Sequence, residues 1–140
     1  MNSIIVIGET CVDRFVYCKS ERLSPEAPVP VLKPIITKEN NGLSGNVVDN
    51  LEDMSEINIK HIHQKNEIIK TRYVDKRSNH MFLRVDSGET VKCDRISIRS
   101  LPNLENASVI ISDYDKGFLT NSDIVNISKV SKFSILDSKK

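Results

Sequence analysis

Runs of apolar residues recur along this chain with the spacing of an α/β protein, and the clearest run lies close to its start. Residues 3–7, Ser-Ile-Ile-Val-Ile, predict a buried strand that ends at Gly8 and is soon followed by Glu9 and Asp13. Open α/β sheets bind ligands beyond the carboxyl ends of their parallel strands. The pattern therefore predicts a small-molecule site at this end of the first strand.

The second half of the chain predicts a strand–helix–strand unit. Apolar runs at 107–111 and 133–137 predict two buried strands. Thr120 followed by Asp123 is a weak capping-box pattern that places the start of a helix between them. The apolar stripe of this helix consists of Ile124, Ile127 and Val130. Such a unit normally pairs in parallel within a larger sheet covered on both faces, so we expect the sheet to be unfinished.

Another helix is predicted from about Gly45 to Met54, where apolar residues share one face. That face consists of Val47, Val48, Leu51 and Met54. Segment 91–106 gives no single answer, because its apolar residues fit a short strand or a helix equally well.

The remaining apolar runs predict further strands. Pro30 and Pro34 interrupt segment 29–36, and proline donates no ladder hydrogen bond, so we expect this segment at a sheet edge or partly irregular. Segments 67–75 and 80–86 flank a polar turn and predict a β-hairpin. Two more short strands are expected at 14–18 and 57–63.

The composition is that of an ordinary globular domain. Its 140 residues are 39% apolar and 28% charged, which suits one domain with a real core. Twenty basic and 19 acidic residues give a formal charge of +1, so we expect neither nucleic acid nor a membrane as a partner. The apolar runs are too short to cross a bilayer and the start lacks the basic region of a signal peptide, which predicts a cytoplasmic protein.

Cysteine and histidine offer no clear chemistry. Cys11, Cys18 and Cys93 are an odd set without metal-ligand spacing or a neighbouring base motif, so we expect reduced thiols and no nucleophilic catalysis. His61 and His63 alternate along a predicted strand and project to one face, which could suit a metal, but no third ligand has an obvious claim. A surface strand explains them better, and we predict no metal site and no catalytic residue.

Polar residues with a plausible ligand role lie beside the first strand and the first helix. The carboxylate of Asp13 could accept hydrogen bonds from neighbouring hydroxyls of a sugar, although a solvated loop aspartate or a helix cap is the simpler reading. Gly42, Gly45 and Asn46 stand at a helix start, where exposed N–H groups and small residues let a polyol or anion approach. The same residue types are also ordinary in loops.

Basic residues on the predicted hairpin form a second group. Lys70 and Arg72 share one face and Arg84 lies on the second strand, so together they could face a phosphate. A solvated sheet face is the alternative. Asp113 and Lys116 follow the strand that ends at residue 111, at the sheet edge that should also carry Asp13 and Gly42.

Seven motifs follow one another in order, and the Ser-Pro-Glu-Ala-Pro-Val-Pro block at 24–30 is particularly specific. They are Val6-Ile7-Gly8-Glu9 with Asp13-Arg14; residues 23–31; Gly42 with Gly45-Asn46-Val47; Lys70-Thr71-Arg72; Leu83-Arg84-Val85-Asp86; residues 111–117, Ile-Ser-Asp-Tyr-Asp-Lys-Gly; and Leu136-Asp137-Ser138-Lys139. In this series the chain resembles the N-terminal part of a ribokinase-like (PfkB) carbohydrate kinase. It is most similar to the kinases of D-glycero-D-manno-heptose 7-phosphate.

The resemblance implies a fold and a site. The fold would be a partial ribokinase-like α/β domain: a mostly parallel, Rossmann-like sheet with helices, plus a small β lid at about 14–37 and 67–87 that often makes the dimer contact. A sugar or sugar phosphate would be the ligand, ATP and Mg²⁺ would be the cofactors, and the chain would form a homodimer through the lid. The implied sugar-site residues are Asp13, Gly42 and Asn46, with Arg72, Arg84, Asp113 and Lys116 as polar or phosphate contacts.

Three departures from the family pattern matter. Gly8-Glu9 replaces the usual Gly-Asp and Gly42-Leu43 replaces Gly-Gly, which narrows the space where the backbone meets a ligand. Only sixteen residues separate Met54 from Thr71, too few for an additional strand and helix, so this is a reduced version similar to short phage-encoded relatives. None of the five glycines belongs to a Gly-x-Gly-Asp segment, and no Walker motif is present, so the C-terminal nucleotide-binding half is absent.

These observations support two functional hypotheses. The chain is the acceptor-binding half of a sugar or sugar-phosphate kinase in a bacterial or phage-infected cell, and is not competent alone. Alternatively, it is a non-catalytic module that binds a sugar phosphate or forms a dimer. An incomplete gene product with an exposed sheet edge after Leu136 is a third reading. The sequence does not identify the sugar or the hydroxyl that is phosphorylated.

Overall fold

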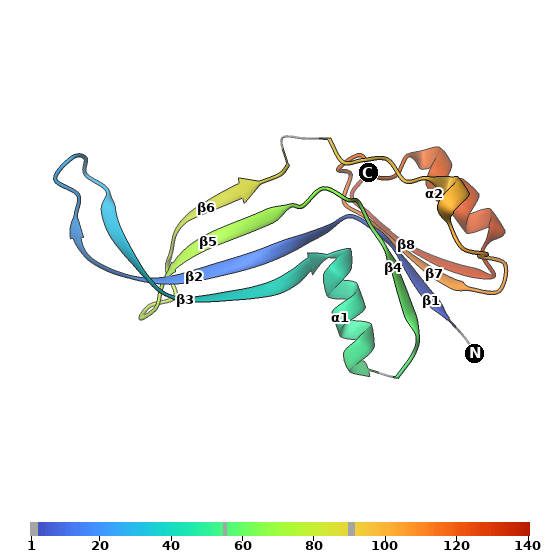
Figure 1. Cartoon of the computed structure of the whole chain (residues 1–140), viewed down its shortest axis with the longest axis horizontal. Helices are drawn as coiled ribbons and strands as arrows, with labels where there is room; N and C mark the ends of the chain where they lie inside the picture. Colours follow the sequence, from blue (N-terminus) through green and yellow to red (C-terminus); the bar gives the residue numbers. More distant parts are fainter. Residues whose placement is uncertain (1–2, 55, 90–91) are drawn as a thin grey trace.

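A four-stranded parallel sheet, sheet A, forms one end of the molecule (Figure 1). The computed structural model describes residues 3–54, 56–89 and 92–140. In sheet A the strands are ordered β4-β1-β7-β8 and all pairs are parallel. Their bounds are β1 (Ile4–Gly8), β4 (Ile59–Ile62), β7 (Ser108–Asp113) and β8 (Phe133–Ser138). The α/β class and the parallel strand–helix–strand unit predicted from the sequence are thereby confirmed.

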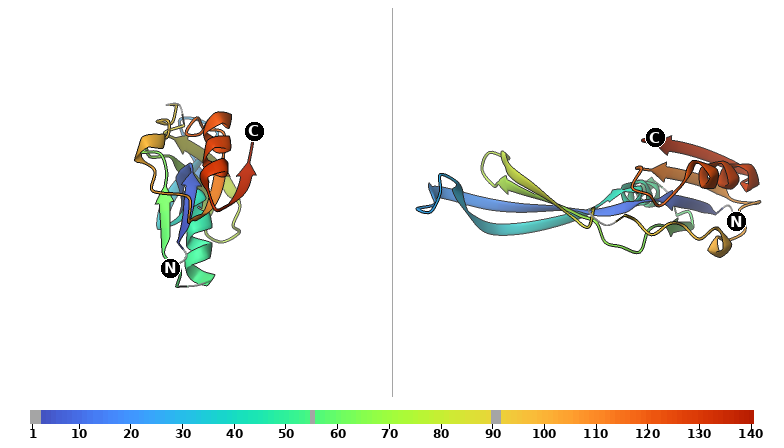
Figure 2. Two further views of the ribbon diagram at one scale, coloured as in Figure 1. Left: turned by 90° about the vertical axis from the view of Figure 1, so that its right-hand side faces the viewer. Right: turned by 90° about the horizontal axis from the view of Figure 1, so that it is seen from above.

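A second four-stranded sheet, sheet B, extends from sheet A as a long arm (Figures 1 and 2). Its order is β3-β2-β5-β6, with β2 antiparallel to β3 and parallel to β5, and β5 antiparallel to β6. The bounds are β2 (Thr10–Leu23), β3 (Pro30–Leu43), β5 (Ile69–Asp75) and β6 (Met81–Ser87). The hairpin prediction is confirmed.

The arm strands are longer than their apolar runs indicate. The short strand expected at 14–18 is the middle of the fourteen-residue β2, because both faces of this part of the arm carry polar residues and hide the alternation. The expected edge position of the proline-containing segment is confirmed, since β3 is an outer strand and Pro34 pairs with Cys18 at a register shift. The strand expected at 57–63 is shorter and covers only β4.

Two helices pack on opposite faces of sheet A. The helix α1 (Ser44–Met54) follows β3 directly and lies against β1 and β4 on the face that carries Val6 and His61. The helix α2 (Asn121–Val130) lies on the other face, and the predicted capping box between Thr120 and Asp123 is present. Neither described helix is long and apolar enough to span a bilayer.

The prediction is wrong for the last residue of each apolar stripe, which is exposed and does not face the core. Met54 is 81% exposed and Val130 is 53% exposed, because both stand in the final turn, where the helix has passed beyond the sheet. The inner members of the α2 stripe, Ile124 and Ile127, are buried.

The main core lies between sheet A and α2. Its strand members share one face of the sheet and are Ile5, Ile7, Val109 and Ile111. Segment 92–107 covers this core with Cys93, Ile96 and Leu104. Neither alternative predicted for 91–106 is right: beyond residue 91, which is outside the described residues, the segment is irregular except for a 3₁₀ turn at Ile98–Ser100.

Candidate functional site

Glu9 is the single residue between β1 of sheet A and β2 of sheet B. It is completely buried, and its carboxylate accepts hydrogen bonds from three backbone N–H groups of the loop that follows β7. The donors are Tyr114 (2.8 Å), Lys116 (3.0 Å) and Phe118 (3.3 Å). Glu9 therefore fixes the loop at the carboxyl edge of sheet A, where ligands of such sheets bind.

Three of the predicted sugar-site residues meet just beyond this junction. Arg72 Nη1 donates a hydrogen bond to Asp13 Oδ1 at 2.7 Å, and the pair is partly buried. The guanidinium group also lies over the Phe15 ring, 5.1 Å from its centroid, which fixes its orientation. A Cβ at Gly42 would come within 2.4 Å of Asp13 Oδ2 and 2.5 Å of Cys11 Sγ, so only glycine leaves room for the Asp13 carboxylate in this position.

The backbone is strained where β3 passes into α1. Leu43 has a φ of 57°, in the left-handed region that glycine adopts freely and other residues adopt at a cost of about 1–2 kcal/mol. This is the position at which the family pattern has its second glycine. The strain accompanies a tight connection, in which the Ser44 N–H donates to the Glu9 carbonyl at 2.9 Å.

His61 supports the start of α1 from β4. Its Nε2 lies 2.8 Å from Ser44 Oγ, which itself donates to the Gly8 carbonyl at 3.1 Å, so the imidazole is the donor in the first contact. Burial, with a smaller contribution from nearby His63, lowers the pKa of His61 to about 4. The ring is therefore neutral at pH 7 and serves α1 as a hydrogen-bond donor.

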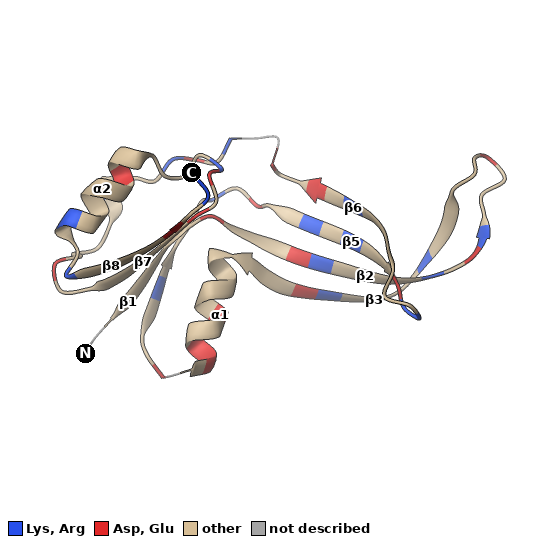
Figure 3. Cartoon of the chain, turned by 180° about the vertical axis from the view of Figure 1, so that it is seen from behind, with Lys and Arg blue, Asp and Glu red and all other residues tan. Residues whose placement is uncertain are grey.

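Charged residues occur along all four strands of sheet B (Figure 3), and the strand register places Lys70, Arg72, Arg84 and Asp86 on the same face as Asp13, here called the inner face. Glu89 lies between two lysines, with Nζ of Lys116 at 2.8 Å and of Lys70 at 3.7 Å. Arg84 is paired with Asp86 at 2.7 Å, and this ion pair lowers the pKa of Asp86. Lys70 and Arg84 thus share the face of Arg72, as the sequence predicts.

Two predicted site residues lie apart from this group in their contacts. The Asp113 carboxylate is buried and contacts Ser138 Oγ at 2.8 Å and Lys140 Nζ at 3.1 Å, which ties the end of β7 to the end of β8. Asn46 is exposed in the first turn of α1. The structure therefore brings Asp13, Gly42 and Arg72 together, whereas Asp113 and Asn46 lie outside this group.

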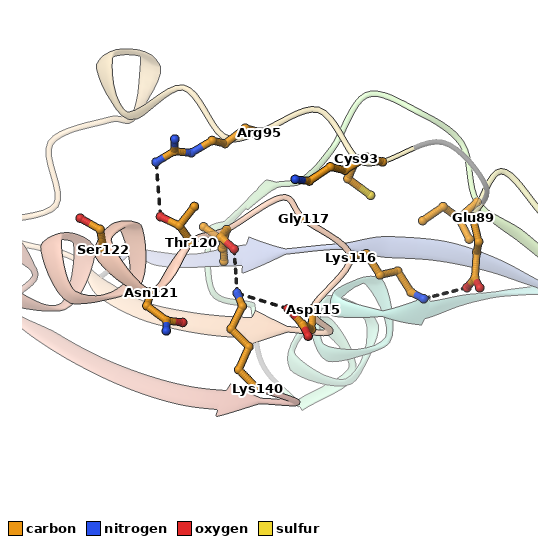
Figure 4. Close-up of a pocket in the computed structure, with 13 residues that line it drawn as sticks. Glu89, Cys93, Arg95, Asp115, Lys116, Gly117, Thr120, Asn121, Ser122 and Lys140 are labelled. Carbon is orange, nitrogen blue, oxygen red and sulfur yellow. Dashed lines mark hydrogen bonds and ion pairs between the residues drawn. The ribbon is translucent and has the colours of Figure 1, made fainter.

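A hollow of about 1300 Å³ opens at the carboxyl edge of sheet A and is lined in part by Asp115, Lys116 and Gly117 of the loop after β7 (Figure 4). Lys116 and Glu89 lie at one end of it, and Lys140 lies near the start of α2. Lys140 Nζ donates to the Leu119 carbonyl at 2.7 Å. Sequence reasoning missed three residues that organise this region, namely Glu9, Glu89 and Lys140, and only Glu9 carried a signal, its place at the end of a buried strand.

The histidines and cysteines have structural surroundings. The rings of His61 and His63 lie 4.6 Å apart, and within residues 3–54, 56–89 and 92–140 no group of three or more His, Cys, Asp or Glu side chains could hold a metal ion. All three cysteines are free and buried, and burial raises the pKa of each thiol.

A parallel sheet joined at its carboxyl edge to a β arm is a ribokinase-like fold. Solved structures share this fold. Phosphofructokinase-2 from Escherichia coli, in its tetrameric inhibited form, has a TM-score of 0.54 at 12% identity and covers 99% of this chain and 55% of its own. A carbohydrate kinase from Agrobacterium tumefaciens has a TM-score of 0.57 at 12% identity and covers 99% and 53%.

Sequence comparison identifies curated relatives. The bifunctional protein HldE of Erwinia tasmaniensis is 30% identical over 122 residues, which are 82% of this chain and 24% of the relative. HldE of Hyphomonas neptunium is 28% identical over 163 aligned residues, covering 91% of this chain and 33% of the relative. Comparison with models of known protein families gives no match.

The chain therefore belongs to the ribokinase-like (PfkB) carbohydrate kinase family, with HldE proteins among its relatives, as its motifs predict. It spans about a quarter to a third of the length of these curated relatives and about half of the solved kinase chains.

Proposed function

We propose that this chain is the acceptor-binding half of a sugar or sugar-phosphate kinase and that it does not transfer phosphate alone. The observation that carries the proposal is the group of Asp13, Gly42 and Arg72 at the junction of the two sheets. The side chains of this group can hydrogen-bond to a sugar. The group also lies at the edge of the sheet where open α/β proteins bind ligands.

The contacts of this group suggest a different role in ligand binding for each residue. Asp13 keeps acceptor capacity beyond its bond to Arg72 and would accept hydrogen bonds from adjacent sugar hydroxyls. Gly42 leaves the backbone open beside it. Two cations of the inner face, Lys70 and Arg84, together with Lys116 of the loop after β7, would attract the phosphate of a sugar phosphate such as D-glycero-D-manno-heptose 7-phosphate.

Phosphoryl transfer needs more than this chain supplies. It requires a base for the attacking hydroxyl and a preorganised site for the transferring phosphate, usually with Mg²⁺. The sequence has no Gly-x-Gly-Asp segment, and the described residues contain no cluster suited to a metal ion. The residues present do not fit ATP and Mg²⁺, although the ribokinase of Cryptococcus neoformans, a structural neighbour, was solved with ADP.

Calorimetry with D-glycero-D-manno-heptose 7-phosphate tests the acceptor site. We expect binding that Asp13→Asn or Arg72→Met weakens at least tenfold, because each substitution removes one side of the charged pair. Arg14→Met is the matched control, since Arg14 is the next residue of β2, points to the other face and pairs with Glu39 at 2.6 Å. No binding by the folded protein, or equal weakening by the control, contradicts the proposal. ATP-dependent phosphorylation by the chain alone contradicts its second part.

The outer face of sheet B supports a homodimer as part of the same proposal. Tyr73 pairs with Leu83 and Thr71 with Val85 on this face, and Leu83 and Val85 are 44% and 43% exposed. A second copy placed on this face would remove these apolar side chains from water. Sedimentation velocity tests this: wild type is expected to be a dimer and Leu83→Lys a monomer, and a dimer that survives the substitution contradicts it.

A non-catalytic module is the second candidate, favoured because the sequence has no Gly-x-Gly-Asp segment and the described residues contain no cluster suited to a metal ion. It shares the expected sugar-phosphate binding. The two candidates differ in whether the chain gains kinase activity when the rest of a kinase domain is supplied.

A further inference from the structure

The carboxylate of Glu89 lies in a position that suits an anion. Its Oε1 atom faces two ammonium groups at once, with Lys116 Nζ at 2.8 Å and Lys70 Nζ at 3.7 Å. Lys70 belongs to β5 and Lys116 to the loop after β7, and their side chains are only 13% and 23% exposed. Lysine binds phosphate as a point charge, so two partly buried lysines around one oxygen form a position that suits a phosphate oxygen.

The charges around this position leave one cation in excess. On the inner face, Arg72 and Arg84 each have a carboxylate of their own. Within the part of the chain that the structure describes, Glu89 is the only carboxylate in an ion pair with either Lys70 or Lys116. Its single negative charge is therefore set against two positive charges. The dianion of a phosphate group would match the two ammonium groups more fully than one carboxylate does.

The position is open to a ligand and lies beside the proposed acceptor group. Glu89 and Lys116 both line the hollow at the carboxyl edge of sheet A, where Figure 4 shows their ion pair. Lys70 is the register partner of Asp13 across β5 and β2. The Cys11 thiol lies among these charges: burial and Asp13 raise its pKa, and both lysines lower it. A sugar held by Asp13 could therefore place a phosphate group near the two lysines.

The side chain of Glu89 can leave this position while its backbone stays in place. Gly88, the residue before it, has a φ of 83°, and a Cβ there would collide with the Glu67 carbonyl oxygen, so the turn packs closely on its neighbour. The Glu89 side chain itself is 29% exposed and borders water. Its hydrogen bond with Lys116 lowers the pKa of Glu89, so the carboxylate is charged at neutral pH and competes with any other anion for the lysines.

We infer that Glu89 holds the place of the ligand's phosphate: a phosphate dianion binds between Lys70 and Lys116, and the Glu89 carboxylate rotates into solvent as it does so. The inference rests on the proposed function, because it assigns the phosphate of the acceptor sugar to this lysine pair. Glu89 thereby lowers the affinity for every phosphorylated ligand, since each must displace it. A neutral sugar leaves both ion pairs in place. Free phosphate has the same chemistry as a phosphate ester, so the test includes both.

Calorimetry at about pH 8, where phosphate esters are dianions, tests the inference with D-glycero-D-manno-heptose 7-phosphate, inorganic phosphate and the unphosphorylated heptose. We expect Glu89→Gln and Glu89→Ala to tighten binding of both phosphate probes about tenfold, because the competing anion is gone, and to leave the heptose unaffected. Adding Lys116→Met to Glu89→Gln should abolish the gain. Glu39→Gln is the matched control, since it removes the carboxylate that pairs with Arg14 at 2.6 Å on the other face of β2, and it should bind as wild type does. Circular dichroism checks that each variant is folded.

The alternative is that Glu89 only braces the end of β6 against the loop after β7. Phosphate binding that neither Glu89 variant tightens, or a gain that Lys116→Met leaves intact, overturns the inference. So does equal tightening by Glu39→Gln or for the unphosphorylated heptose, and so does failure of both phosphate probes to bind. Asp13→Asn separates the two proposals. If it leaves sugar-phosphate binding unchanged while Glu89→Gln tightens it, the acceptor site alone is refuted. If Asp13→Asn weakens binding and Glu89→Gln does not tighten it, the displacement of Glu89 alone is refuted.

Discussion

The buried carboxylate of Glu9 offers the sharpest test of how this fold is held together. We consider Glu9→Gln, which keeps the size and shape of the side chain and removes its charge. Glu9 accepts three backbone N–H groups, two on Oε1 and one on Oε2. A carboxylate accepts on both oxygens, whereas an amide accepts on one and donates on the other.

The expected loss follows from this count. If the amide oxygen keeps the Lys116 and Phe118 donors, the amide nitrogen faces the Tyr114 N–H, which lay 2.8 Å from Oε2 and is left unsatisfied. Hydrogen bonds to a charged group contribute about 1.5–3 kcal/mol each, and neutral ones about 1 kcal/mol. One bond is lost and two are weakened, while the neutral amide is less costly to bury, so we expect a net loss of about 2–3 kcal/mol.

Urea unfolding followed by circular dichroism at pH 7 measures this difference. Glu52→Gln, the same change at an exposed position of α1, is the control and should stay within about 0.5 kcal/mol of wild type. Hydrogen exchange should also quicken at the amides of residues 114–118. A Glu9→Gln protein as stable as wild type would refute the role assigned to this carboxylate.

Three further predictions follow from single contacts. Gly42→Ala should lower stability by about 1–3 kcal/mol and abolish sugar-phosphate binding, because the new Cβ collides with the Asp13 carboxylate; calorimetry and urea unfolding measure both. The pKa of His61 is lower in the folded chain, about 4 against an ordinary 6.5, so its contribution to stability is complete above pH 6.5 and is lost as the pH falls toward 4. Partial exposure limits this loss to about 1–2 kcal/mol, which His61→Gln should remove and His80→Gln, at an exposed turn, should not. The three buried thiols, whose pKa values burial raises, should resist a thiol reagent at pH 8 until urea unfolds the chain, and rapid labelling in the folded state contradicts their burial.

Continuous apolar runs made sheet A predictable. A buried parallel strand such as β7 is apolar on both faces, so the whole strand is recognisable in the sequence as a continuous apolar run. The arm strand β2 carries charges on both faces, as Asp13 and Arg14 illustrate, so only its more apolar middle is recognisable. Segment 92–107 buries apolar residues although its backbone is irregular. Its course could not be predicted, because an irregular segment has no hydrophobic periodicity.

Site residues were predictable where the residue type and its position in a local motif already indicate the role. Asp13 and Arg72 were found as motif residues, and their contact follows from parallel pairing of β2 with β5. Glu89 had no local signal, because its role arises from lysines on two distant segments. The role of Glu9 depends on amides more than 100 residues away, which no pattern around position 9 records.

The single-residue joint between β1 and β2 also has a mechanical consequence. The fourteen residues of β2, at roughly 3.3 Å each, make a lever about 46 Å long with its pivot at Glu9. A rotation of about 5° at that pivot would swing the far end of the arm by roughly 4 Å, yet it would displace Asp13, four residues from the pivot, by only about 1 Å. Contacts made near this pivot, such as those proposed for Asp13, would therefore change little if the arm tilted.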